Sequence, residues 1–269
     1  MKKLLKQYVI WTYGVFYCFI LLIGMAMLVL KWNALAGVLQ VISAWTATFV
    51  FIAMFHKIYP EDSLKQFITR QFREKIKLSS VAWLVLLQTA LFLCCILITS
   101  IFRKISITSI FMTSWTTWLF TFLDNLIRGP LGEELGWRGF VFNELQKKYS
   151  PLKAAMIVGV VWGFWHTPLW FLSGYAGIQL LTYIISFLVY IISASVIMTV
   201  FYHRNHNLLI PIIAHQLFNY FLAMQTGDVL QNLMVTAIVY LIVAIVLVLV
   251  SPDGLRSSKL APNCVTMKH

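Results

Sequence analysis

The sequence contains eight apolar stretches, each about long enough to cross a bilayer as a helix. A transmembrane helix needs about 20 predominantly apolar residues. Within hydrocarbon, a helix satisfies its backbone N–H and C=O groups internally, which an open strand or a loop cannot do. The stretches lie near residues 8–30, 34–56, 80–102, 109–127, 152–172, 177–202, 207–225 and 229–250. They predict an all-α polytopic membrane protein with about eight transmembrane helices.

The composition leaves little room for a separate soluble domain. Of the 269 residues, 60% are hydrophobic and 11% are charged, whereas a soluble domain has about 45–50% and about 25%. We therefore expect residues 1–269 to form a single integral membrane domain that ends in a polar tail at 251–269.

The basic start "MKKLLK" raises the alternative of a signal peptide. The apolar run that follows covers Tyr8 to Leu30, whereas the apolar region of a signal peptide is usually only about 7–15 residues long. We therefore expect this run to be a retained first span.

The net charge of +12 first suggests a nucleic-acid partner. If the N-terminus is cytoplasmic and eight helices alternate, however, most Lys and Arg residues fall in cytoplasmic segments. The three basic residues expected outside are Lys31, Arg103 and Lys104. This asymmetry follows the positive-inside rule. The charge thus predicts a lipid bilayer as the partner, no nucleic acid, and a multi-pass membrane protein with both termini cytoplasmic. We expect the membrane to be a bacterial cell membrane.

Residues 62–78 combine an apolar face with many basic residues. The apolar positions at helical spacing are Leu64, Phe67, Ile68, Phe72 and Ile76. The pattern predicts an amphipathic helix lying on the cytoplasmic headgroups. A plain basic linker is the alternative.

Residues 109–148 contain a Gly129–Pro130 pair that either separates two helices or kinks one long helix. Two crossings would place Lys147 and Lys148 outside and invert every later loop. We therefore favour one crossing, with the glutamates beyond its midpoint toward the cytoplasm.

The stretch "GPLGEELGWRG", residues 129–139, places charged side chains in this apolar setting. An ionisable group within a bilayer costs a few kcal/mol and is functional by default. Glu134 and Arg138 are four residues apart and are expected to pair along one helix face. Glu133 points elsewhere on the helix and is left without that counter-ion. Pro130 and the neighbouring glycines are expected to bend the helix and to let other helices approach closely.

Two other spans carry polar side chains at the same four-residue interval, Trp162 with His166 and His215 with Asn219. Either pair alone is typical of hydrogen bonding between helices. Together with Glu133, they supply a base, two imidazoles and an amide donor, which water-mediated amide hydrolysis requires.

Three more polar residues precede the Gly129–Pro130 pair. Asp124 and Asn125 either join helices or line an aqueous path to the site, and the first alternative is favoured. Arg128 is expected to pair with Asp124 or to snorkel toward the headgroups.

These residues resemble the motifs of the CAAX protease and bacteriocin-processing family, which includes the endopeptidases that trim prenylated CAAX proteins. "EELGWR" is similar to its EExxxR motif, "WGFWH" to its motif of an aromatic residue followed by His, and "HQLFN" to its HxxxN or HxxxD motif. Phenylalanine is common where this chain has Trp162. The resemblance covers about 110–220 and implies a catalytic core of helices at about 110–225.

The resemblance implies a role for each matching residue. Glu133 and His166 would activate the attacking water, and His215 and Asn219 would stabilise the tetrahedral oxyanion. Glu134 and Arg138 would hold the geometry of their helix and tune the charge around Glu133.

The cofactor stays open at this point. Glu133, His166 and His215 would leave one position free for water on a bound Zn²⁺ or another divalent metal. The family is often described as metalloproteases, and a metal-free glutamate mechanism has also been proposed for it. The chain has no HExxH motif.

We therefore expect an intramembrane endopeptidase that hydrolyses a peptide bond of a membrane-associated or leader-bearing substrate with Glu/His-activated water. The alternative is a non-proteolytic immunity or scaffolding protein with the same fold. A small secondary transporter is disfavoured because the sequence shows no repeated halves.

Overall fold

The computed structural model describes residues 2–251 and residue 255, and the regular elements in that part of the chain are helices. In chain order they are α1 (Lys2–Leu28), α2 (Asn33–Ala44), α3 (Thr46–Ile58), α4 (Leu64–Gln71), α5 (Leu78–Arg103), η1 (Ile107–Ser109), α6 (Trp115–Ile127), α7 (Pro130–Glu134), η2 (Leu135–Phe142), α8 (Asn143–Gln146), α9 (Pro151–Trp165), α10 (Thr167–Phe171), α11 (Gly177–Asn205), α12 (Leu209–Ala223) and α13 (Val229–Val250). The all-α prediction is confirmed. The polar tail predicted at 251–269 lies outside the described residues, apart from Ser251 and Leu255.

In the part of the chain that the structure describes, four helices are long and apolar enough to cross a membrane, namely α1, α5, α11 and α13. Helices α2 and α3 pass the same test as a pair that is bent by 51°. The polytopic class is therefore confirmed, but several of the eight predicted spans are not single full-length helices. The stretches 109–127, 152–172 and 207–225 hold shorter helices. Pro130 and Pro168 each lie at the start of a new helix, where proline's missing N–H costs nothing.

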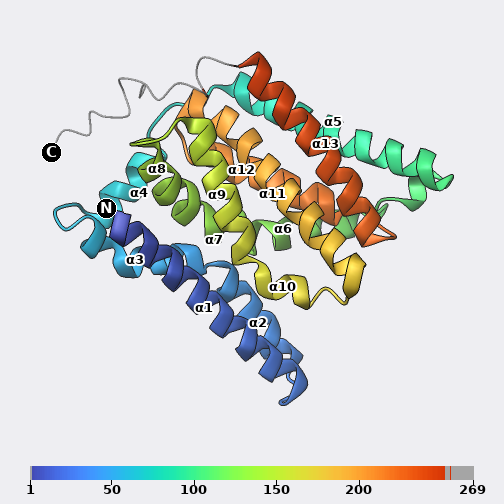
Figure 1. Cartoon of the computed structure of the whole chain (residues 1–269), viewed down its shortest axis with the longest axis horizontal. Helices are drawn as coiled ribbons and strands as arrows, with labels where there is room; N and C mark the ends of the chain where they lie inside the picture. The colour runs from blue at the N-terminus through green and yellow to red at the C-terminus, as the bar shows by residue number, and fades with distance from the viewer. Residues whose placement is uncertain (1, 252–254, 256–269) are drawn as a thin grey trace.

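The arrangement of the helices is visible in Figure 1. Helices α1 to α3, in blue, pack together on one side, and α5 and α13 lie together on another. Helix α11 packs against α9, α12 and α13, and it is the most enclosed of the long helices. Helix α7 contacts α3, α6 and α12, which places the predicted glutamates among three different segments.

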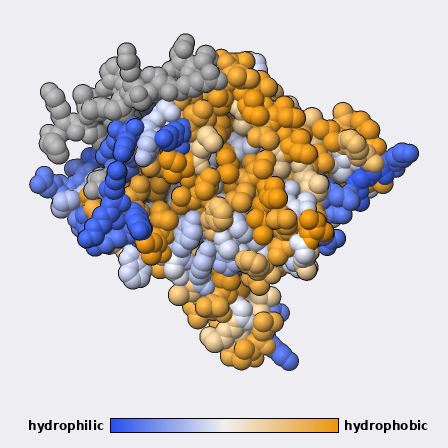
Figure 2. All heavy atoms as spheres, viewed as in Figure 1, coloured by the Kyte–Doolittle hydropathy of each residue, from blue (hydrophilic) through white to orange (hydrophobic). Residues whose placement is uncertain are grey.

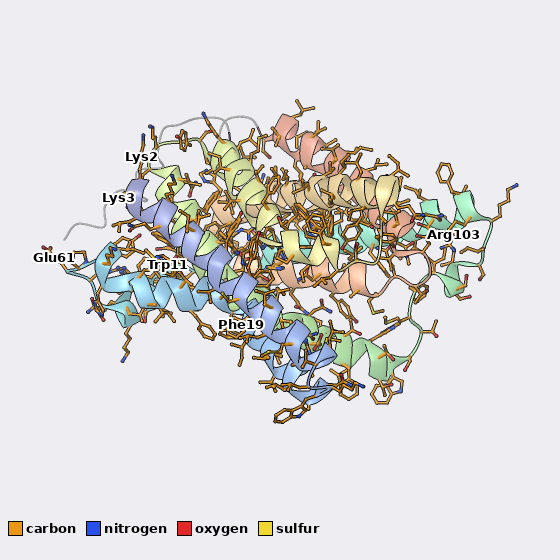
Figure 3. All side chains as sticks on the ribbon, turned by 60° about the horizontal axis from the view of Figure 1, so that its bottom comes forward. Lys2, Lys3, Trp11, Phe19, Glu61 and Arg103 are labelled. Carbon is orange, nitrogen blue, oxygen red and sulfur yellow. The ribbon has the colours of Figure 1, made fainter. Side chains whose placement is uncertain are left out.

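The surface is that of a protein surrounded by lipid. Figure 2 shows broad apolar areas between hydrophilic patches at the edges of the molecule. In Figure 3, Lys2, Lys3 and Glu61 lie toward one end and Arg103 toward the other. Large apolar side chains are exposed between these ends, including Leu21 at 74%. Soluble monomers rarely expose apolar patches above a few hundred Å², so the surface supports the membrane assignment.

The amphipathic segment is shorter as a helix than the sequence suggests. Helix α4 ends at Gln71, and residues 72–77 are not helical. The Leu208 N–H donates to the Gln71 carbonyl at 2.8 Å. The Asn207 amide donates to the carbonyls of Phe72 and Glu74 at 3.0 and 2.7 Å. These bonds hold the chain after α4 against the start of α12, and they replace the helical hydrogen bonds that a longer α4 would form.

The Gly129–Pro130 pair separates two helices, because α6 ends at Ile127 and α7 begins at Pro130. The chain then continues as a π-helix, η2, which the sequence analysis did not predict. π-Helical turns are rare and often occur at functional sites. The expectation of close approach is confirmed at Gly132, where an added Cβ would lie 2.8 Å from the Ala44 carbonyl oxygen at the end of α2.

Candidate functional site

The two adjacent glutamates are buried and have different partners. Glu134 has no exposed surface, and its Oε1 accepts a hydrogen bond from Arg138 Nη1 at 3.0 Å. Arg138 is 1% exposed, so the predicted pair along one helix face is confirmed and is fully enclosed. The guanidinium carbon of Arg138 also lies 4.3 Å from the centre of the Trp162 ring, a cation–π contact.

Glu133 is 4% exposed and forms no ion pair with the described residues. Its Oε2 accepts a hydrogen bond from Trp162 Nε1 at 2.6 Å. The indole N–H comes from α9, so the bond joins the first and second sequence motifs across two helices. Among the described residues this is the one side-chain hydrogen bond of the Glu133 carboxylate.

His166 lies where α9 ends, and its Nδ1 lies 2.8 Å from the backbone carbonyl oxygen of Trp162. A carbonyl oxygen only accepts, so Nδ1 carries the hydrogen in this contact. In the neutral ring, Nε2 is then the acceptor. The ring is enclosed by Trp165 and Phe187, with centroids 4.7 and 5.2 Å away.

His215 is 1% exposed and belongs to the same charged group as Glu134. Its Nδ1 lies 2.6 Å from Glu134 Oε1, across 81 residues of sequence. The ring stacks on Phe218 at 4.8 Å with an interplanar angle of 6°. The Trp162 and His215 rings form a T-shaped contact, with their centroids 4.9 Å apart. These contacts fix the ring plane and leave Nε2 as its second functional atom.

Asn219 lies one turn after His215 on α12, and the two side chains meet at the helix break. A Cβ added to Gly129 would lie 2.8 Å from Asn219 Nδ2 and 3.4 Å from His215 Nε2. Two nitrogen atoms from α12 therefore flank the bare face of Gly129. A side chain at 129 would force the Asn219 amide to move, so glycine leaves room for the amide in its present position.

Before the break, Asp124 and Asn125 bond within their own segment, and Arg128 reaches across to α2. Arg128 donates through Nε to Asp124 at 2.6 Å and through Nη1 to Gln40 Oε1 at 2.7 Å, so the predicted Asp124–Arg128 pair is confirmed. Asn125 donates to the Thr121 carbonyl within its own helix. The indole N–H of Trp45 donates to the Ile127 carbonyl at 2.9 Å, which ties the end of α6 to the bend between α2 and α3.

The described residues do not form the metal site that the sequence left open. No group of three or more His, Cys, Asp or Glu side chains in residues 2–251 and 255 is placed to hold a metal ion. A tetrahedral Zn²⁺ site needs three protein ligands around one open position. Glu133, His166 and His215 do not fit that requirement in this geometry, and no step below is assigned to a metal.

Two features of the site were absent from the sequence analysis. Trp162 was treated there as a departure from phenylalanine, whereas its N–H is the donor to Glu133. Gly129 was treated as part of a bend, whereas it borders Asn219 and His215. The departure at 162 was itself the available signal, because only Trp of these two residue types has an N–H donor.

The candidate site combines groups that accept a proton with groups that donate a hydrogen bond. Glu133 and His166 present atoms that accept a proton, and Asn219 presents an amide donor that points at the helix break. The Glu134–Arg138–His215 group lies beside them, out of contact with solvent. A site of this kind is suited to adding water to a carbonyl carbon and holding the resulting negative oxygen.

Comparison with known proteins covers the same part of the chain. Residues 113–221 match the family model described as type II CAAX prenyl endopeptidase Rce1-like. A curated relative, CAAX prenyl protease 2 of Methanococcus maripaludis, is 32% identical over 164 residues, which are 58% of this chain and 60% of that protein. The chain thus spans less than two thirds of the relative's length. The matched region contains all seven residues of the three motifs.

Proposed function

We propose that this protein is an intramembrane endopeptidase that hydrolyses a peptide bond with water activated by Glu133 and His166. The match of residues 113–221 to the model of Rce1-like CAAX prenyl endopeptidases supports the proposal. The substrate is a membrane-associated or leader-bearing peptide or protein. The observation that carries the proposal is the meeting of the three motifs at hydrogen-bond distance, Glu133 with Trp162 and Glu134 with His215.

Glu133 is the proposed general base. Its carboxylate is buried and unpaired with any cation among the described residues, so it can take a proton from water without first breaking an ion pair. His166 offers Nε2 as an acceptor, because its Nδ1–H is held by the Trp162 carbonyl. As the water oxygen bonds to the substrate carbonyl carbon, its proton moves to this pair. The same proton is then delivered to the leaving amine as the C–N bond breaks.

His215 and Asn219 are the proposed oxyanion stabilisers. Asn219 Nδ2 is a donor in every protonation state. His215 donates Nδ1–H to Glu134, so its Nε2 can donate to an oxyanion once the ring carries both protons. The charge of Glu134 is in turn shared with Arg138. We therefore propose that Glu134 and Arg138 hold the His215 ring in place.

The substrate class follows from the membrane setting and from the relative. A buried site within a polytopic protein suits a peptide that is already held at the membrane. The name of the Methanococcus maripaludis relative refers to a CAAX prenyl protease, and a lipid-modified C-terminal peptide is accordingly one candidate. Leader-bearing precursors are the other.

Comparative peptidomics of membranes tests the proposal. Membranes with the wild-type protein should release peptides that membranes with Glu133→Gln do not release, at matched protein levels. Gln keeps an oxygen that accepts from Trp162 but cannot serve as a base. If both membranes give the same peptides while a wild-type phenotype persists in Glu133→Gln, the non-proteolytic immunity or scaffolding function replaces this proposal.

A further inference from the structure

From a single position on α9, Trp162 contacts four of the six candidate site residues, namely Glu133, Arg138, His166 and His215. Its indole N–H donates to Glu133, and its backbone carbonyl accepts from His166. Its ring faces the Arg138 guanidinium, and a T-shaped contact joins it to His215. The side chain is 1% exposed. No other described residue contacts both Glu133 and His166 in this way.

Ordinary core packing is the simplest alternative, since buried Trp residues are common in membrane proteins. Two other buried tryptophans of this protein serve as a comparison for packing without a hydrogen bond. Trp137 and Trp165 are 0% and 1% exposed, and the Nε1 atom of each lacks a hydrogen-bond partner among the described residues. The structure therefore tolerates buried indoles with free N–H groups. The hydrogen bond from Trp162 to Glu133 is therefore not a general consequence of burying an indole in this protein.

The N–H of Trp162 fixes one oxygen of the Glu133 carboxylate. Oε2 is held at 2.6 Å, a short distance of the kind found in hydrogen bonds to charged acceptors. Because Oε2 is held, the carboxylate can rotate less, and Oε1 is the oxygen left to meet water. Tryptophan suits this task since its large ring has only two side-chain torsions, and here that ring is packed on Phe218 and Arg138.

The backbone of the same residue fixes the imidazole. The Trp162 carbonyl holds His166 Nδ1 at 2.8 Å, which sets the tautomer and directs Nε2 away from the helix. The spacing between the Glu133 carboxylate and the His166 ring is therefore set by one rigid residue. A base and its partner imidazole need such fixed spacing, because a misplacement of about 1 Å can lower a rate about 100-fold.

We propose that Trp162 is a positioning residue of the site, whose indole N–H holds the Glu133 carboxylate in its reactive orientation. The proposal rests on the endopeptidase function given above and adds a residue that acts through Glu133. A phenylalanine at this position could not donate such a bond.

The kinetic test replaces Trp162 by Phe in the full-length protein in liposomes, with a peptide that wild-type membranes cleave and Glu133→Gln membranes do not. We expect kcat to fall about 10- to 100-fold while KM changes less than about threefold. Trp137→Phe is the matched control, because it removes an equally buried indole whose N–H has no partner, and it should keep wild-type kcat. Equal kcat in the two variants would overturn the proposal.

A second variant separates the hydrogen bond from the packing. Benzothienylalanine at position 162 keeps the ring size and replaces the N–H by sulfur. It should reproduce the loss of kcat with a melting temperature close to that of the wild type. A wild-type kcat in a well-folded benzothienylalanine protein would show that ring packing, not the N–H, matters.

The contact itself can be measured without activity. The indole N–H vibration of Trp162, assigned from the Trp162→Phe difference spectrum in UV resonance Raman, should shift in Glu133→Leu. An unchanged vibration would overturn the proposal even if the protein is a protease. A shifted vibration in a protein that cleaves no peptide would instead contradict the proposed function and leave the contact standing.

Discussion

Two neighbouring carboxylates in this protein lie in different surroundings. On the Arg138 side, which consists of Glu134, Arg138 and His215, one oxygen accepts from a guanidinium and also meets an imidazole. On the Trp162 side, which consists of Glu133, Trp162 and His166, the carboxylate has one neutral donor. Both glutamates are buried. The chain thus surrounds one carboxylate with a guanidinium and an imidazole, and it leaves the neighbouring carboxylate with a single neutral donor.

The difference indicates a division of labour. A buried charge needs partners to be stable, and removing one partner of a buried pair is strongly destabilising. The Arg138 side has such partners and is therefore expected to contribute to the fold as well as to the site. The Trp162 side has few partners that would be lost on mutation. Its carboxylate is accordingly the one that can exchange protons during a reaction.

The first prediction, which has the largest expected effect, compares the loss of each carboxylate. Glu133→Gln should lower kcat by about 100- to 10,000-fold, the usual contribution of a general base, with little change in melting temperature. Glu134→Gln should lower the melting temperature strongly as well as the activity. Equal damage to stability from both variants would contradict the division. The measurements are peptide cleavage in liposomes and thermal unfolding in detergent.

The second prediction concerns the Arg138 side alone. Arg138→Met leaves Glu134 buried with His215 as its remaining partner and should lower the free energy of unfolding by about 3–5 kcal/mol. The double variant Glu134→Gln/Arg138→Met removes both charges and should be less destabilised than Arg138→Met. Unfolding by detergent titration gives both values. Additive losses would show that the two residues are not coupled.

The fold could be predicted only to the level that hydropathy reaches. Apolar stretches of about 20 residues identify membrane helices, and the class was predicted correctly from them. The positions where helices end were harder to predict, because the mean hydropathy of a window stays high when a helix ends within an apolar stretch. The early end of α4 is a tertiary effect, since the hydrogen bonds that replace its last turn come from Asn207 and Leu208, far along the chain.

The contacts of the candidate site likewise divide into local ones, which the sequence predicts, and long-range ones, which it does not. The Glu134–Arg138 pair depends on a four-residue spacing and is local, so the sequence was sufficient to predict it. The Trp162–Glu133 and His215–Glu134 contacts join residues 29 and 81 apart. They depend on how α7, α9 and α12 meet, which spacing within one helix does not determine. The catalytic roles of these residues stay predictions.

The third prediction concerns Gly129, which borders His215 of the Arg138 side and Asn219 at the helix break. Gly129→Ala places a Cβ 2.8 Å from Asn219 Nδ2, so the amide must move. We expect about a 10- to 100-fold loss of kcat, as for other small displacements in an active site. Gly37→Ala is the control, because its Cβ would meet nothing within 4 Å.

A double variant tests whether the loss of kcat in Gly129→Ala arises from the displaced Asn219 amide. If Gly129→Ala acts through Asn219, it should cause little further loss in an Asn219→Ala protein. A full additional loss there would mean that the alanine disturbs the helix break instead, and that the two nitrogens at Gly129 do not act together.

The last prediction uses a third buried glutamate as a reference. Glu144 is 7% exposed, and its Oε1 accepts from Tyr59 at 2.5 Å and from Lys147 at 2.7 Å. It lies in α8, outside the three motifs. Glu144→Gln keeps an oxygen for Tyr59 and loses a pair with a lysine side chain that is 61% exposed, so the cost should be at most about 1 kcal/mol. Cleavage should stay within about twofold of the wild type. A loss as large as that of Glu133→Gln would show that burial of a carboxylate, rather than its place beside Trp162, is what the activity requires.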